Sequence, residues 1–435
     1  YAMQGPMKYK RLAISADCAP DLVARIVAWA AAHPYAFVLD SAGVGAGYDL
    51  MAGVAIAPLL QAEAGRAFQA LEQAYRQKNG LWLFGFLAYD LKNEVENLRS
   101  YHCDDIGLPD MGFICADTIL LMRNAEIELL SRRSDPQQLW EKIGATPLPA
   151  LSPHSPPLAL RPRLSRAAYV EALEHIREHI VEGDVYELNF CQEFSAEQVS
   201  INPVATFSAM RRGPFGAFVR WDDRYVLCAS PERFLKKEGV KIISQPIKGT
   251  RPRGLDPEAD EAAKVELASN EKDRAENVMI VDLVRNDLAR NCLPGSVRTE
   301  ELFGIYSFPY VHQMISTVSG VLRPDASAIE ALRDAFPMGS MTGAPKIRAM
   351  QLIERYEKSR RGLFAGAIGY ISPEGDFDFN VVIRSLIYNA RSGYLSLHAG
   401  GAIVYDSDPQ QEYEESLLKA RSALPGDPAR FFLDV

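Results

Sequence analysis

The chain has 435 residues, 48% of them hydrophobic, so it can bury a large core, and its length predicts two or three domains. Its net charge of -9 argues against nucleic acid or an anionic membrane as a partner, since both require a basic surface, and no apolar run is long enough to span a bilayer. The cysteines form no Cys-x-x-Cys pair, which is typical of reduced thiols and predicts a cytoplasmic protein without a disulfide framework.

The first part of the chain predicts strands with helices between them. Its opening letters, YAMQGP, resemble a cloning remnant, so we expect translation to begin at Met7 and find no signal peptide. A helix is predicted at 21–32, and strands are predicted at 37–41, 81–91 and 118–131.

A proline-rich segment follows, from Ala145 to Ser165. So many prolines exclude a helix interior and a central strand, so we interpret this segment as a linker. The predicted domains are therefore 7–144 and 166–435, with 145–165 between them.

A helix is predicted between Ser165, a favourable N-cap, and Gly183. It contains HIREH, with His175 and His179, which matches a H-x-x-E-H zinc pattern. Because no third ligand lies nearby in the sequence and charged residues surround the histidines, we interpret this face as solvated and not as a metal site.

The rest of the chain alternates apolar strand patterns with a few helices. The strand VYELNFCQEF is followed by further strands, several joined by short turns that favour antiparallel pairing. The predicted fold class is α+β, with large, mainly antiparallel β-sheets flanked by helices.

The segment GSMTGAPK precedes a helix predicted to run to about Lys358. Its glycines and the helix start could bind an anion, with the hydroxyls of Ser340 and Thr342 as further donors. An ordinary glycine turn before a helix explains the same pattern, and the segment alone does not decide between them.

Two predicted helices each carry a pair of acids spaced i, i+3. The first pair is Asp273 and Glu276, and the second is Glu412 and Glu415, with Lys419 one turn further. Carboxylates from two facing helices could hold Mg²⁺, but such pairs usually face solvent.

Three further positions combine charge or glycine with apolar neighbours. Arg384 is predicted within the strand VVIRSL, where it would pair with a buried acid or grip a carboxylate ligand. Gly400 and Gly401 in HAGGAIV allow a close approach to a strand or form a bulge. Lys248, in SQPIKGTRPRG, is either a surface lysine or a desolvated amine whose lowered pKa makes it a nucleophile or base.

In chain order, these segments resemble the motifs of the chorismate-utilising enzymes, which include the anthranilate, aminodeoxychorismate, isochorismate and salicylate synthases. The matching stretches run from about Gly183 to Leu424 and read SPERFL, PIKGTRPRG, AENVMIVDLVRNDLAR, GSMTGAPKIRAM, GAIGYIS, VIRS, AGGAIVYDSDPQQEYEES and KA. The segment FVLDS, at 37–41, resembles the tryptophan-binding segment found near the N-terminus of this family.

The resemblance implies a role for each candidate residue. Magnesium would bind, directly or through water, to Asp273, Glu276, Glu412 and Glu415 and neutralise the ring carboxylate of chorismate. Arg384, Gly400 and Gly401 would hold the enolpyruvyl carboxylate. The other substrate-binding positions implied are Ser340, Phe364, Lys419, Thr250 and Glu187.

Within the family, Lys248 discriminates between branches. Anthranilate synthases resemble PIAGT at this position, whereas aminodeoxychorismate synthases typically read PIKGT. In the latter, the resemblance implies that the lysine amine adds at carbon 2 of chorismate while the carbon 4 hydroxyl departs, after which ammonia displaces the lysine. Glu232, in SPERF, would be the acid–base partner.

Two positions depart from the family pattern. Isochorismate and salicylate synthases have a lysine base at the position of Glu187, which excludes them, while many other members have glutamine there. Gln313 stands where the family usually has a histidine that assists the leaving hydroxyl. The neighbouring His312 should face the opposite side of its strand, so we expect Glu232 or an ordered water to supply the proton.

These features predict component I of an aminodeoxychorismate synthase, which uses chorismate, Mg²⁺ and ammonia from a separate glutamine amidotransferase subunit. The alternatives are an anthranilate synthase component I and a chorismate-binding subunit that has lost its activity. Whether tryptophan binds the N-terminal segment stays open.

Overall fold

The computed structural model describes residues 9–15, 21–43, 47–77, 80–149, 158–425 and 431–433. The expected start at Met7 and the middle of the proline-rich segment, 150–157, lie outside these residues. None of the helices within the described ranges is long and apolar enough to cross a membrane.

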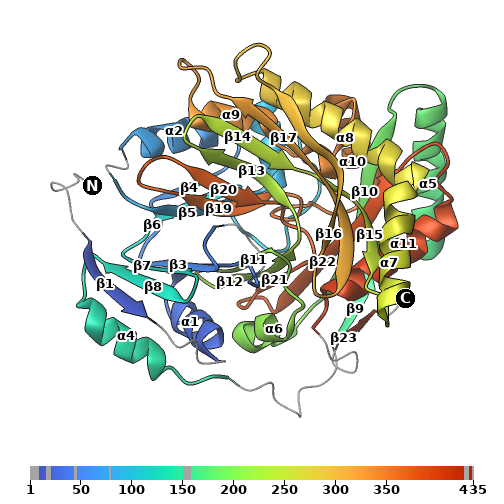
Figure 1. Ribbon diagram of the computed structural model, residues 1–435. Coiled ribbons are helices and arrows are strands. Elements are labelled where there is room, and N and C mark those ends of the chain that lie inside the picture. Colours follow the sequence, from blue (N-terminus) through green and yellow to red (C-terminus); the bar gives the residue numbers. More distant parts are fainter. Residues whose placement is uncertain are drawn as a thin grey trace.

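Two large sheets form the framework (Figure 1). The strands of the first sheet follow in the order β1 (Lys10–Ser15), β8 (Glu126–Ser131), β7 (Thr118–Arg123), β3 (Leu50–Ala55), β2 (Tyr35–Asp40), β11 (Phe215–Trp221), β12 (Arg224–Ser230), β21 (Ser385–Asn389), β22 (Tyr394–Ile403), β10 (Glu187–Ala196), β9 (Leu158–Pro162) and β23 (Phe431–Leu433), and β18 (Gly343–Ala344) also pairs with β10. The second sheet has the order β15 (Ile247–Pro252), β17 (Val311–Val321), β14 (Lys241–Gln245), β13 (Arg233–Glu238), β20 (Phe377–Asn380), β19 (Ala367–Ile371), β5 (Leu83–Leu87), β6 (Met111–Cys115) and β4 (Leu60–Ala62), with β16 (Arg298–Ser307) on the other side of β17.

Helices pack against both sheets. Those that contact the first sheet are α1 (Leu22–Ala31), α4 (Pro136–Gly144), α5 (Arg166–Val181), α6 (Pro203–Ala209), α10 (Lys346–Tyr356) and α11 (Pro409–Ala423). Those around the second are α2 (Ala67–Gln77), α7 (Pro257–Ser269), α8 (Glu271–Ala289) and α9 (Ala328–Ala335). Apart from β23 with β9, the strand pairs among the described residues are antiparallel, which confirms the predicted α+β class.

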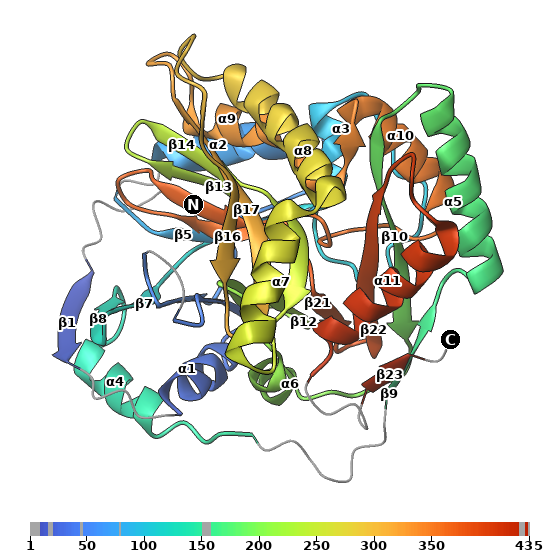
Figure 2. The ribbon, with the colours of Figure 1, turned by 45° about the vertical axis from the view of Figure 1, so that its right-hand side comes forward.

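The core lies partly between the two sheets. Phe37 and Met51 of the first sheet pack in one cluster with Phe84 and Phe86 of the second. Two further clusters fill the spaces between each sheet and its own helices. The resulting order is helices, sheet, sheet and helices, with α7, α8 and α11 on the same side of the molecule in Figure 2.

Both predicted domains contribute to both sheets. Strand β2 from 7–144 pairs with β11 from 166–435, and β5 pairs with β19 in the second sheet. The two segments therefore share their cores, because strands far apart in sequence can pair side by side. The end of the proline-rich segment also differs from the expected linker: Leu158–Pro162 forms β9, where an apolar run allows pairing and Pro162 ends the strand.

Two segments near the candidate site are interrupted, and one of them is the strand predicted around Arg384. The segment KIISQPIKGT is divided at Pro246 into β14 and β15. The segment NVVIRSLIYN is also interrupted, so Arg384 lies just before β21 and not inside a strand, with a φ of 52°. Proline lacks the amide hydrogen that a ladder needs, which accounts for the first break.

Candidate functional site

Lys248 is buried at the start of β15 and forms an ion pair with Glu187. Its Nζ lies 2.5 Å from Glu187 Oε1 and 3.8 Å from Glu276 Oε2, and the lysine is only 9% exposed. Glu187 is the first residue of β10, and its other carboxylate oxygen, Oε2, is buried without a hydrogen-bond partner among the described residues. The interpretation of Lys248 as a surface residue is therefore wrong.

The expectation that Lys248 has a lowered pKa is wrong. Burial alone lowers the pKa of this lysine, as the sequence suggested, but the charges of Glu187 and Glu276 outweigh it and raise the pKa above its usual value. The resting amine is therefore an ammonium ion. A nucleophilic role requires that a neighbouring group accepts one of its protons.

The segment GSMTGAPK positions Glu187. Gly343 and Ala344 form β18, which pairs with Glu187 and Leu188 at the start of β10. Gly343 has a φ of 150°, and a Cβ there would lie 2.1 Å from the carbonyl oxygen of Glu187, so only glycine allows this approach. The segment thus serves as a close backbone contact to β10.

The hydroxyls in this segment donate within the protein, which corrects the expectation that both are available to an anion. Thr342 Oγ1 contacts the carbonyl oxygens of Met338 and Gly339, and Ser340 Oγ donates to Glu232 Oε1 at 2.7 Å. Ser340 therefore belongs to the candidate site through Glu232.

Glu232 is a buried acid between β12 and β13. Burial raises its pKa to about 7, although the hydrogen bond from Ser340 and the charge of Lys248 oppose this shift. A carboxyl group with such a pKa exists in both protonation states near neutral pH. Glu232 can therefore donate or accept a proton, in agreement with the acid–base role that the sequence predicted.

Gln313 lies on β17, opposite Thr250 of β15. It is 1% exposed, and neither its amide oxygen nor its amide nitrogen has a hydrogen-bond partner in the described part of the chain. His312 is bound elsewhere: Nε2 lies 2.9 Å from Asp260 Oδ1, and Nδ1 lies 2.9 Å from Ser307 Oγ. These contacts hold the His312 ring on Asp260 and Ser307, and its inability to replace a histidine at 313 stays a prediction.

Arg384 is an unpaired cation within the described residues. Its guanidinium makes no hydrogen bond or ion pair there, although its backbone carbonyl accepts one from the amide of Ala229. Burial lowers the pKa of the guanidinium, while the charge of Glu232 acts in the opposite direction. Of the two interpretations from sequence, pairing with a buried acid is not observed at contact distance. The guanidinium is therefore available to a carboxylate ligand.

The two acidic helices face each other across the ammonium group of Lys272. Its Nζ lies 3.9 Å from Glu276 Oε1 on α8 and 3.6 Å from Glu412 Oε1 on α11. Burial lowers the pKa of Lys272, but Glu412, Glu276 and Glu415 outweigh it and raise the pKa, so the group stays charged. Lys272 was not predicted as a site residue, although its i, i+4 spacing from Glu276 indicated an ion pair.

Gly401 leaves room beside these acids. A Cβ at this position would lie 3.1 Å from Glu412 Oε2 and 3.9 Å from Glu415 Oε1. Carboxylate oxygens on two facing helices, with space beside Gly401, are the type of group that Mg²⁺ prefers, whereas the ammonium of Lys272 would have to move aside for a metal ion. Asp273 instead forms an ion pair with Arg251, whose Nη2 lies 2.9 Å from Asp273 Oδ2.

Three further candidates, Gly400, Lys419 and Phe364, contact other parts of the protein. Gly400 packs on β10, because a Cβ there would lie 1.9 Å from the carbonyl oxygen of Phe190. Lys419 Nζ donates to the carbonyl oxygen of Gly400 at 3.0 Å and pairs with Glu415 at 2.7 Å. Phe364 is buried and stacks on His398, with the ring centroids 4.9 Å apart.

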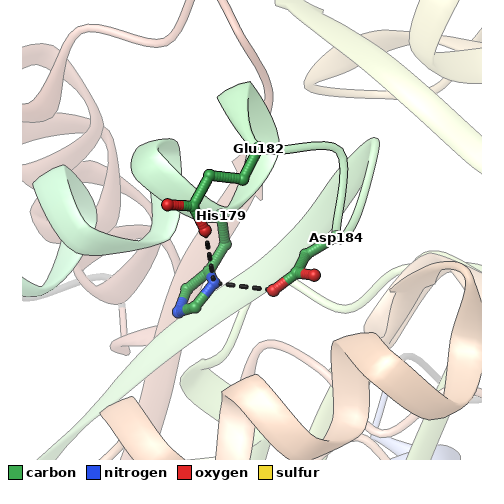
Figure 3. A group of neighbouring side chains, drawn as sticks. All are labelled: His179, Glu182 and Asp184. Atoms are coloured by element: carbon green, nitrogen blue, oxygen red, sulfur yellow. Dashed lines mark hydrogen bonds and ion pairs between the residues drawn. The ribbon is translucent and has the colours of Figure 1, made fainter.

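His179 of the H-x-x-E-H pattern belongs to a different cluster (Figure 3), whereas His175 Nδ1 lies 3.1 Å from Glu178 Oε2 on the same helix. His179 lies beside Glu182 and Asp184, and one potential ligand atom from each lies within 4.8 Å of the others. Asp184 also pairs with Arg348, and His179 Nε2 lies 3.0 Å from the hydroxyl of Tyr356. These contacts join the end of α5 to α10, and the positive charge of Arg348 opposes a cation here.

A cavity of about 270 Å³ lies beside the FVLDS segment. Leu39 and Ser41 line it together with Trp82, Tyr370 and Asn380. The binding of tryptophan near this segment stays a prediction.

Comparisons with known proteins agree with this geometry. The family model described as chorismate binding enzyme matches residues 37–425. Aminodeoxychorismate synthase component 1 of Klebsiella aerogenes is 41% identical over 344 residues, which cover 78% of this chain and 76% of the relative. Its counterpart from Salmonella typhimurium is 39% identical over 353 residues, which cover 80% and 76%. The crystal structure of anthranilate synthase component I from Streptococcus pneumoniae superposes with a TM-score of 0.72 at 27% identity and covers 97% of this chain and 93% of that one.

Proposed function

The chain belongs to the chorismate binding enzyme family, and on that premise we propose that it is the component of an aminodeoxychorismate synthase that converts chorismate and ammonia to 4-amino-4-deoxychorismate. The observation that carries this proposal is the position of Lys248, buried beside Glu187 and near the acid–base residue Glu232. The relatives named as aminodeoxychorismate synthase component 1 support it.

Lys248 would act as the nucleophile. Its amine adds to carbon 2 of chorismate and forms a C–N bond, both ring double bonds shift by one position, and the carbon 4 hydroxyl leaves. Glu187 Oε1 is the nearest acceptor for the proton that the ammonium must first lose. Glu232, when protonated, can give the leaving hydroxyl the proton with which it departs as water.

Ammonia then attacks carbon 4 of the covalent adduct, loses a proton as the new C–N bond forms, and the lysine leaves carbon 2 as both ring double bonds return to their original positions. The leaving amine takes up a proton and Lys248 is restored. Two such displacements place the new amine at carbon 4. A family member without this lysine lacks the first displacement, which is why Lys248 separates the two regiochemistries.

Charged groups around the site would hold the substrate. Arg384, with no protein partner among the described residues, would bind one carboxylate of chorismate through two hydrogen bonds. Glu276, Glu412 and Glu415 would hold magnesium, with Asp273 close to Glu276. Magnesium, when bound, supplies positive charge that neutralises the other carboxylate of the substrate.

We propose a separate glutamine amidotransferase as the source of ammonia. The relatives are named as component 1 of their enzymes, which supports a second component. Free ammonia should replace glutamine in an assay of the isolated chain.

Product identification tests the proposal. The chain, chorismate, Mg²⁺ and ammonium at high pH, coupled to a lyase that converts 4-amino-4-deoxychorismate, should yield 4-aminobenzoate. Anthranilate in its place would instead support the alternative favoured by the structural match to an anthranilate synthase. The absence of either product would support a subunit that has lost its activity.

A further inference from the structure

Lys272 occupies an unusual place between the two acidic helices. It lies on α8, one turn before Glu276, and its side chain extends to Glu412 on α11. The ammonium group is therefore the cation that joins α8 to α11 at the proposed metal site.

The lysine compensates a concentration of negative charge. Glu276 is 12% exposed and Glu412 only 5%, so water screens their repulsion poorly. Glu415 adds a third carboxylate near the same space, because Gly401 faces both it and Glu412. Lys419 pairs with Glu415 and Lys248 lies 3.8 Å from Glu276, so Lys272 supplies the charge that offsets the repulsion between Glu276 and Glu412 across the two helices.

The side chain of Lys272 is more exposed and less tightly bound than that of Lys248. Its side chain is 51% exposed, whereas that of Lys248 is 9% exposed and held at 2.5 Å by Glu187. The distances from Lys272 to its two acids, 3.9 and 3.6 Å, exceed those of a direct hydrogen bond. A long, flexible and half-exposed side chain can carry its ammonium group into solvent when another cation takes over the charge of the two acids.

We propose that Lys272 is a tethered counter-ion that a divalent metal displaces from between Glu276 and Glu412, so that this lysine sets the metal affinity of the site. The inference rests on the proposed magnesium site. A cation carried by the chain competes with the metal for the same oxygen ligands, and the apparent affinity falls by the fraction of the site that the lysine occupies. The lysine in turn keeps α8 and α11 together before the metal binds.

Calorimetric titration of the full chain with Mg²⁺ tests the inference. Replacing Lys272→Met removes the competitor and should tighten Mg²⁺ binding about three- to tenfold, the range expected for a partly exposed ion pair. The matched control is Lys264→Met, which removes the same charge from an ion pair with Glu261 on the neighbouring helix α7. This control should bind Mg²⁺ like the unchanged protein.

The reactivity of the Lys272 amine provides a second, independent measurement. Limited acetylation of the unchanged protein, quantified by peptide mass spectrometry, should increase at Lys272 when Mg²⁺ is added and stay constant at Lys264. Unchanged or weaker Mg²⁺ binding by Lys272→Met would overturn the inference and leave the metal site intact. No Mg²⁺ binding by either protein would overturn the metal site, and the inference with it.

Discussion

Glu187 and Lys248 form a buried ion pair, with 2.5 Å between Oε1 and Nζ, that joins the first residue of β10 to the second residue of β15. The pair connects the two sheets at the candidate site, because β10 belongs to the first sheet and β15 to the second. It also places the proposed nucleophile next to the group that can accept its proton. Both the stability and the chemistry of the site should therefore depend on it.

Replacing Lys248→Ala should abolish the covalent adduct with chorismate. The proposed C–N bond forms only at Nζ, so intact-protein mass spectrometry without ammonia should show the adduct in the unchanged protein and none in the variant. Product formation should fall by about three orders of magnitude, as expected for loss of a nucleophile. Lys237→Ala, at a lysine that pairs with Asp376 away from the site, is the control and should keep the adduct.

The ion pair itself should show strong coupling in stability. Glu187→Leu leaves the ammonium of Lys248 buried beside Glu276 alone, so we expect a loss of about 3 kcal/mol in the free energy of unfolding. The double variant with Lys248→Met should recover most of that loss, because neither charge then remains unpaired. Urea denaturation of the four proteins measures the coupling, and additive effects of the two changes would contradict it.

Local patterns in the sequence were sufficient for much of the fold. Ser165 caps α5 as predicted, with its side chain accepting a hydrogen bond from the amide of Ala168, and the two acidic pairs lie on helices as predicted. Periodicity and capping are properties of neighbouring residues, so a single sequence reveals them. Shared sheets depend on contacts between distant residues, and no local pattern indicates that β2 pairs with β11.

The sequence was sufficient to predict which residues form the candidate site, but not how their charges shift each other's pKa. The family motifs indicated Lys248 and Glu232, but the raised pKa of Lys248 depends on Glu187, which is 61 residues away in the chain. Lys272 was missed for the same reason, since its second partner, Glu412, lies on another helix. Charge–charge effects require distances, and only the fold supplies them.

The buried carboxyl group of Glu232 should make stability depend on pH. Its pKa rises from 4.5 to about 7 on folding, so the folded protein binds this proton more tightly than the unfolded chain. The contribution is fully present below about pH 4.5 and is lost as pH rises through 7, which amounts to about 3 kcal/mol. Glu232→Gln cannot ionise and should lack this decrease.

Thermal or urea unfolding of both proteins between pH 4.5 and 8 measures the effect. The unchanged protein should lose stability relative to Glu232→Gln as the pH rises. Because other groups titrate equally in both proteins, the difference isolates Glu232. A constant difference across this range would contradict a raised pKa.

Gln313 should contribute hydrogen bonds to the substrate and no proton. Its amide nitrogen and oxygen are buried without partners among the described residues, so a hydroxyl group of chorismate could satisfy both. If Glu232 supplies the proton to the leaving hydroxyl, Gln313→His should change the rate of the chemical step less than about threefold in single-turnover measurements. Gln313→Leu removes both hydrogen bonds and should weaken that step about tenfold or more. A gain of more than tenfold in Gln313→His would show that the site lacks an efficient acid, and Glu232 would then not carry this role.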